Sequence, residues 1–181
     1  SSILSNITNE YERQRAIDEM PQSGAGKTIM TMQPKFVPNE AIDITIGENL
    51  KSIGSYAFES CTALTQINWN AKKVTGISSF NHIFDYAGQN GDGISVIFGD
   101  SVEKIPSYAF YPASYLKYPA KIASITIGNN VTSIGICAFY NCASLTQINW
   151  NAKNVADFSP DNYVFGFGGW NDGIRVIFGD N

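Results

Sequence analysis

The chain has 181 residues, carries a formal net charge of -4, and is charged at only 15% of its positions. Hydrophobic residues make up 44% of the chain, which excludes a disordered composition, and the length suffices for one domain with a buried core. Its lysines and arginines are scattered, it has no apolar run long enough to cross a membrane, and its start shows no signal peptide. We therefore expect no nucleic-acid binding and no membrane span in this chain.

Residues 1–40 are predicted to form a helix and a linker. Ile3, Ile7 and Tyr11 recur every fourth residue and would share one face of a helix, which Pro21 would end. Because the open core of a repeat protein needs a terminal cap, we expect this helical or irregular segment to cap the domain at residues 41–181. The alternative is that the segment is the tail of a separate upstream domain.

The stretch from Pro21 to Thr28, PQSGAGKT, ends like a phosphate-binding loop. The full motif needs a glycine five residues before its Gly-Lys pair, and Pro21 occupies that position. A predicted helix precedes the stretch and Pro34 follows it, so the strand and helix that should flank the loop are missing. We interpret the stretch as a flexible linker.

The rest of the chain is built on an internal duplication. Residues 44–74 and 125–155 align without a gap, and 21 of the 31 aligned positions are identical. Within this long period a shorter pattern recurs, in which a strand-like start is followed by glycine and, in its fuller copies, by an Ala-Phe pair. The strand-like starts fall at residues 44, 67, 96, 125, 148 and 176. Steps of 23 to 29 residues with an apolar skeleton predict a solenoid, in which stacked units share one core.

Alternate residues of each predicted strand should point inward and outward. The inward set comprises Ile44, Ile46, Ile67, Trp69, Val96, Phe98, Ile125, Ile127, Ile148, Trp150, Val176 and Phe178. The outward ladder comprises Asp43, Thr45, Gln66, Asn68, Ser95, Ile97, Ser124, Thr126, Gln147, Asn149, Arg175 and Ile177. This register makes both tryptophans core residues rather than exposed platforms for sugars.

Glycines follow four of the strands, and we expect them to occupy corners with positive φ. These are Gly47, Gly99, Gly128 and Gly179. The Ala-Phe pairs would lie on the return side of the coil, with the phenylalanine in the core. Two stretches rich in glycine and aromatic residues, 76–93 and 157–173, are predicted to be long loops that leave the same edge of the solenoid.

No group of residues suggests catalysis, a cofactor or a metal site. His82 is the only histidine and has no ligand partners at a suitable spacing, and no Ser-His-Asp arrangement is recognisable. The Asp-Gly turns at 92–93 and 172–173 offer too few oxygens for calcium. Cys61 and Cys142 hold the same repeat position too far apart for a disulfide, so we expect both in the core.

Several fixed spacings in the repeat resemble one known family. The runs Leu145-x-x-Ile148-x-Trp150 and Val131-x-x-Ile134-Gly135-x-x-Ala138-Phe139-x-x-Cys142 look like the BspA-like leucine-rich repeat, over roughly residue 41 to the C-terminus. The resemblance implies a β-rich, right-handed coil of about six repeats with a parallel sheet on one face. It also implies a secreted or surface-displayed bacterial protein that binds host proteins or neighbouring cells.

We therefore expect a non-enzymatic binding module, with a protein or a glycan as its partner. The first candidate surface is the polar ladder formed by Asp43, Thr45, Gln66, Asn68, Ser95, Ser124, Thr126, Gln147, Asn149 and Arg175. The second is a carbohydrate site on the loop aromatics Tyr86, Phe167 and Trp170, which should then be exposed and coplanar. A third possibility is a structural spacer. The last strand leaves an open edge, which would permit self-association.

Overall fold

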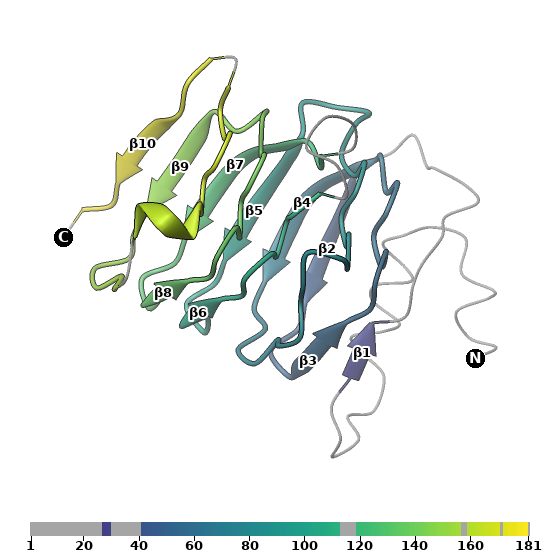
Figure 1. Ribbon diagram of the computed structural model, residues 1–181, viewed down its shortest axis with the longest axis horizontal. Coiled ribbons are helices and arrows are strands. Elements are labelled where there is room, and N and C mark those ends of the chain that lie inside the picture. The colour runs from purple at the N-terminus through teal and green to yellow at the C-terminus, as the bar shows by residue number, and fades with distance from the viewer. Residues whose placement is uncertain (1–26, 30–40, 113–118, 157–158, 171, 181) are drawn as a thin grey trace.

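The computed structural model describes residues 27–29, 41–112, 119–156, 159–170 and 172–180. The predicted helix over residues 1–20 and most of the predicted linker lie outside them. Six strands form one parallel sheet (Figure 1): β2 (Ile42–Ile46), β4 (Leu64–Trp69), β5 (Ile94–Phe98), β7 (Ile122–Ile127), β9 (Gln147–Trp150) and β10 (Arg175–Phe178). They lie side by side in sequence order, so each strand pairs with the next strand of this sheet.

The strands form where alternation predicts them, and the first four bury their inward side chains, whereas β9 buries only Ile148 and β10 buries none. In β5 the buried residues are Ile94, Val96 and Phe98, and the residues between them face outward. The register joins equivalent repeat positions, for example Ile67 with Val96 and Val96 with Ile125. The prediction of a β-rich repeat with a parallel sheet is therefore confirmed.

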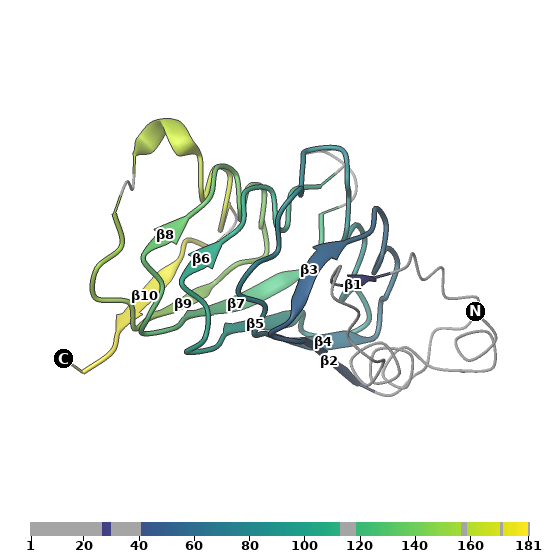
Figure 2. The ribbon, with the colours of Figure 1, turned by 90° about the horizontal axis from the view of Figure 1, so that it is seen from below.

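Shorter strands run along a second side of the molecule, above the main sheet in Figure 2. Strand β3 (Leu50–Ile53) pairs with β1 (Lys27–Ile29), and β6 (Lys104–Ile105) pairs with β8 (Ser133–Ile134). These two pairs do not join, because the chain between them, residues 72–77, forms no strand. The described residues contain one helix, the 3-10 turn η1 (Pro160–Asn162).

We call each strand of the main sheet, together with the chain that leads to the next strand, a rung. The first five rungs each contribute one phenylalanine to a continuous column of rings on the return side. Neighbouring ring centroids in this column are 4.8 to 5.8 Å apart. The column consists of Phe58, Phe84, Phe110, Phe139 and Phe165. It lines the core opposite the sheet, with four of its rings buried and Phe165 partly buried.

The predicted loops 76–93 and 157–173 contain no strand among their described residues, but the expectation that they leave the coil is wrong. Both segments carry a phenylalanine of the column, Phe84 and Phe165, and both stack on their neighbours through backbone hydrogen bonds. Phe58 N donates to Ile83 O at 2.8 Å, and Phe139 N donates to Val164 O at 2.9 Å. The sequence hid this because Ile83 and Val164 replace the alanine of the Ala-Phe pair.

The expected corner glycines do not have positive φ, and at Gly128 the reason for glycine is space. Gly47, Gly99, Gly128 and Gly179 are absent from the residues with positive φ. A Cβ at Gly128 would lie 2.5 Å from the carbonyl oxygen of Phe98, so a side chain there would collide with the neighbouring rung. Positive φ occurs instead on the return side, at the residue two before each column phenylalanine. These residues are Tyr56, His82, Tyr108, Cys137 and Tyr163.

The inward residues are buried as predicted in the first four rungs. Trp69 is fully buried, and the three cysteines are free, with Cys61 and Cys142 buried and Cys137 partly exposed. Trp150, in the fifth rung, is only partly buried. Its Nε1 donates a hydrogen bond to Ala152 O at 3.0 Å. The last strand differs most, because its inward residues Val176 and Phe178 are exposed.

Candidate functional site

The outer face of the main sheet carries the predicted polar ladder in two straight rows. The pairing register aligns one row as Asp43, Gln66, Ser95, Ser124, Gln147 and Arg175. The other row is Thr45, Asn68, Ile97, Thr126, Asn149 and Ile177. The structure thus brings together all ten polar residues that the sequence singled out for this face. Their role in binding stays a prediction.

Polar side chains of the ladder already bond to one another. Gln147 Nε2 donates to Asn149 Oδ1 at 3.0 Å, and Asn149 Nδ2 donates to Thr126 Oγ1 at 3.2 Å. The Gln66–Asn68 pair repeats the first of these bonds at 3.0 Å. A partner that bound here would have to replace these bonds, so much of the gain from new hydrogen bonds would be lost. Within the two rows the charges are confined to the ends, at Asp43 and Arg175.

The predicted aromatic residues do not all belong to one surface. Phe167 and Trp170 are 53% and 73% exposed, and their ring centroids lie 5.9 Å apart. Tyr86 is also exposed, but it lies in the second rung and corresponds to Phe167 in the fifth. The structure therefore joins Phe167 with Trp170 and places Tyr86 three rungs away.

Three tyrosines that the sequence analysis missed extend this aromatic pair into a row. Tyr140 packs edge-on against Phe167 at 5.6 Å and stacks on Tyr111 at 5.2 Å. Tyr111 meets Tyr108 edge-on at 5.4 Å. We call this set, Tyr108, Tyr111, Tyr140, Phe167 and Trp170, the aromatic row. It crosses rungs three to five on the return side of the coil.

Local backbone features hold the aromatic row in place. Gly166 leaves room for the ring of Tyr140, because a Cβ there would lie 2.8 Å from its Cδ2 atom. Phe167 has a φ of 56° and Tyr108 a φ of 58°, a conformation that turns the backbone sharply. Burial raises the pKa of Tyr111, and the neighbouring Tyr140, Cys137 and Tyr108 raise it further. Tyr111 therefore stays neutral at physiological pH.

A simple alignment would have found two of the missed tyrosines. Tyr111 and Tyr140 directly follow the column residues Phe110 and Phe139, so they hold the same repeat position 29 residues apart. The equivalent residues of the first two rungs are Glu59 and Asp85. The aromatic character of this position is thus confined to one half of the coil.

The rings of the aromatic row are not coplanar, contrary to what the carbohydrate hypothesis predicts. Phe167 and Trp170 are inclined at 42°, and Tyr140 and Phe167 at 85°. Only Tyr111 and Tyr140, at 28°, approach a flat platform. The row is a ridged apolar surface rather than a flat one.

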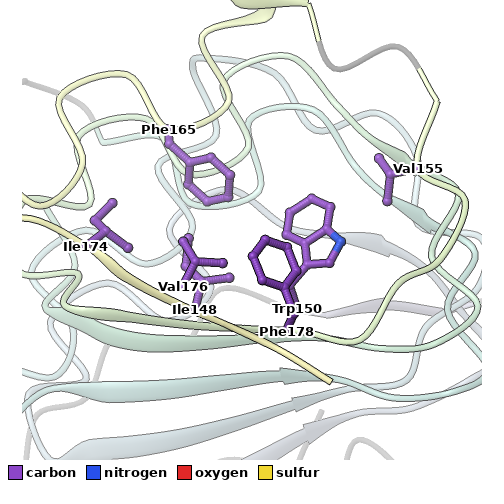
Figure 3. Close-up of a pocket in the computed structure, with 7 residues that line it drawn as sticks. All are labelled: Ile148, Trp150, Val155, Phe165, Ile174, Val176 and Phe178. Carbon is purple, nitrogen blue, oxygen red and sulfur yellow. The ribbon is translucent and has the colours of Figure 1, made fainter. Parts of the chain in front are cut away.

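Two hollows also mark the surface. One, of about 420 Å³, opens at the C-terminal end of the coil (Figure 3). Its lining is apolar and consists of Ile148, Trp150, Val155, Phe165, Ile174, Val176 and Phe178. The other, of about 400 Å³, lies where β3 and β6 fail to join, with Lys72, Lys73 and Lys104 among its lining residues.

The part of the chain that the structure describes holds no group of three or more metal-ligating side chains. Nor do the described residues include a helix long and apolar enough to cross a membrane. His82 Nδ1 lies 4.0 Å from Asp85 Oδ2, beside the phenylalanine column. Nothing in this geometry shows catalytic activity.

Comparison with known proteins identifies the repeat. The profile of the BspA type leucine rich repeat region matches six copies over residues 35–149 and 113–165. The chain belongs to this BspA-type leucine-rich repeat family. Repeats of this family are generally non-enzymatic binding units that contact proteins, and proteins that carry them are typically associated with the cell surface.

The start of this BspA-type chain resembles a different protein. Residues 1–59 match the profile of the ATPase domain of stage IV sporulation protein A. Stage IV sporulation protein A of Bacillus anthracis is 59% identical over 49 residues, which are 27% of this chain and 10% of that protein. The Clostridioides difficile protein of the same name is 50% identical over 48 residues, again 10% of its length.

The chain therefore spans about a tenth of the length of the curated relatives that it matches. The two profiles overlap at residues 35–59, where the first rung of the sheet begins. No solved structure matches the chain significantly.

Proposed function

We propose that the chain is a solenoid of about six units that binds a partner protein, without catalysis, through the aromatic row. One observation carries this proposal: five aromatic side chains contact each other in sequence on one side of the coil, and the last two are more than half exposed. Exposed aromatic clusters are costly in water and are enriched at the centres of protein interfaces. Tyrosine and tryptophan also offer a polar group at the edge of a large apolar surface.

The geometry favours the aromatic row over the polar ladder. The rings of the row are fixed by the backbone and by each other, so a partner would order few side chains on binding. The ladder, in contrast, is a nearly neutral surface whose amides are already bonded. We propose adhesion to a host protein or a neighbouring cell, on the surface of a bacterium, as the setting of this interaction. Membership of the family supports a location on the cell surface. The aromatic row would supply the surface that contacts the partner protein.

The test is binding of the purified chain to immobilised extracellular-matrix proteins and to a glycan array. Saturable binding to a protein, lost in Phe167→Ser/Trp170→Ser, would support the proposal. Phe80→Ser is the matched control, because Phe80 is 80% exposed but lies outside the row. Binding that survives Phe167→Ser/Trp170→Ser but is lost in Gln66→Lys/Asn68→Lys would move the site to the ladder and overturn the proposal.

A glycan partner is the second candidate function. The exposure of Trp170 favours it, since exposed aromatic faces stack on sugars, while the inclined rings of the row speak against it. Binding to a glycan alone, lost in Trp170→Ser, would replace the protein partner by a carbohydrate. Absence of binding to either array would favour a structural spacer.

We further propose that residues 1–40 cap the first rung and have no ATPase activity of their own. Two observations support the cap: β1 pairs with β3, and the inward residues of β2 are buried although β2 is an edge strand. A chain that begins at residue 41 should then unfold at lower denaturant concentration than the full chain. Hydrolysis of ATP by the purified full chain would contradict the second half of this proposal.

A further inference from the structure

The second side of the coil has a break in its backbone hydrogen bonding between rungs two and three. Rungs one and two are joined there, since Thr75 N donates to Lys51 O at 3.0 Å. No backbone hydrogen bond joins residues 72–77 to residues 103–107, two segments that the structure describes in full. Both segments line the hollow of about 400 Å³, which we call the lysine groove. The groove lies in the interior of the repeat array.

The sequence accounts for this break. In rung four the amide of Gly135 donates to Ile105 O at 2.9 Å and so joins rung four to rung three. The equivalent position of rung three is Pro106, and proline has no amide hydrogen to donate. The amide and carbonyl of one strand residue point to the same edge, and those of the next residue point to the other edge. Because the carbonyl of Ile105 points to rung four, the amide and carbonyl of Lys104 face the lysine groove.

Exposed lysines and buried apolar residues alternate along both walls of the groove. On one wall Lys73 is exposed and Val74 is buried. On the other wall Lys104 is exposed and Ile105 is buried. Lys72 is a third lysine of the lining, although the chain as a whole carries a net charge of -4. The fold thus brings together lysines that are scattered in the sequence, and the groove has an apolar floor and a basic rim.

Acidic neighbours neutralise only part of this charge. Lys72 Nζ lies 3.0 Å from Glu48 Oε2, and because both side chains are about half exposed this ion pair is weak. Lys73 and Lys104 form no ion pair within the described part of the chain, even with the adjacent Glu103. Two lysines, one on each wall, are therefore available to an acidic ligand.

We propose that the lysine groove binds an extended acidic segment of a partner protein, in which acidic and apolar residues alternate. The segment adds a strand beside β6, and its backbone bonds to the amide and carbonyl of Lys104. Successive side chains of a strand point to opposite faces, so its apolar side chains enter the groove over Val74 and Ile105. Its carboxylates then meet Lys73 and Lys104 at the rim. The groove shares no residue with the aromatic row, and this proposal does not depend on the row.

Fluorescence anisotropy with a fluorescein-labelled peptide of alternating glutamate and valine tests the proposal. The peptide should bind saturably, and Lys73→Glu/Lys104→Glu should weaken binding about tenfold or more, because like charges would then meet. Lys153→Glu/Arg175→Glu is the matched control, since it changes the net charge equally at exposed residues outside the groove. The circular dichroism spectra should show that both variants are folded. No binding by the wild type, or an equal effect of the two double variants, would overturn the proposal.

N-methylated peptides test the addition of a strand. One version carries methyl groups on the glutamate amides only, and the other on the valine amides only. An added strand turns one of these sets of amides toward Lys104 and the other set away from it, so only one version should lose binding. In an antiparallel pair Lys104 bonds to the opposite glutamate, and in a parallel pair it bonds to the valines beside that glutamate. Equal binding of the two versions would overturn the strand addition.

Two further measurements separate the groove from other surfaces. A neutral peptide of alternating glutamine and valine should bind about tenfold more weakly than the acidic peptide, and equal binding would mean that the lysines contribute nothing. Phe167→Ser/Trp170→Ser, which removes the exposed end of the aromatic row, should bind the acidic peptide as the wild type does. Peptide binding that is lost in this variant but kept in Lys73→Glu/Lys104→Glu would place the acidic segment on the row and overturn the proposal.

Discussion

The same five residues, VIFGD, occur at 96–100 and at 176–180, and the structure treats them in opposite ways. In the middle of the sheet Val96 and Phe98 are 0% and 1% exposed, whereas Val176 and Phe178 at the end are exposed. Both copies form strands that pair with the preceding rung in the same register. Identical local sequence therefore gives identical local structure, and the next rung decides how much apolar surface is buried. A unit of this protein completes its core only through its neighbour.

The largest test of this comparison removes the same side chain from both copies. Phe98→Ala should lower the free energy of unfolding by about 3–5 kcal/mol, since it leaves a cavity next to Trp69 and Phe139. Phe178→Ala should cost less than about 1 kcal/mol in the monomer, because little surface around it is buried. Urea unfolding at low protein concentration measures both. Equal costs would mean that the end of the coil is covered in solution.

The buried thiol of Cys142 should make the stability of the fold depend on pH. Burial raises the pKa of Cys142 to about 12, from an ordinary value of 9.0. The unfolded chain loses the thiol proton first, so the stability that Cys142 contributes is complete below pH 9 and declines between pH 9 and 12. The wild type should therefore lose about 1 kcal/mol more than Cys142→Ala between pH 9 and pH 10. Unfolding curves that depend equally on pH in both proteins would contradict this.

Cys137 provides the matched contrast within the same rung. Its side chain is partly exposed. Partial desolvation by burial raises the pKa of its thiol. A thiol reagent at neutral pH should therefore modify Cys137 in the folded chain and leave Cys61 and Cys142 untouched. Mass spectrometry of the modified peptides measures this order, and equal labelling of all three would show that the core opens.

The smallest expected effect concerns the backbone near the open end. Tyr163 has a φ of 46° and an exposed side chain, so Tyr163→Asn should stabilise the chain by up to about 1 kcal/mol, because asparagine tolerates this conformation better. Tyr108 has a φ of 58°, but its ring contacts Tyr111, and Tyr108→Asn should bring no gain. Thermal unfolding of the two variants measures the difference. A gain at Tyr108 equal to that at Tyr163 would show that the ring contact contributes nothing.

The sequence by itself determined the repeat, the six strand positions, the two faces of the sheet and the family. These follow from local alternation, since an apolar residue at every second position fixes which side of a strand is buried. The same signal placed Trp69 in the core and the polar ladder outside.

Only the tertiary structure decided the rest, because it depends on contacts between rungs. Phe84 and Phe165 join the column although Ile83 and Val164 hide the repeat there. Nine residues other than glycine adopt positive φ two positions before or after a phenylalanine of that column. The aromatic row exists because Tyr111, Tyr140 and Phe167 stack across rungs, a relation that no single repeat contains. The exposure of Phe178, unlike that of Phe98, depends on the presence of a further rung. Packing between units is the physical reason for all of these features, and a sequence pattern within one unit does not specify it.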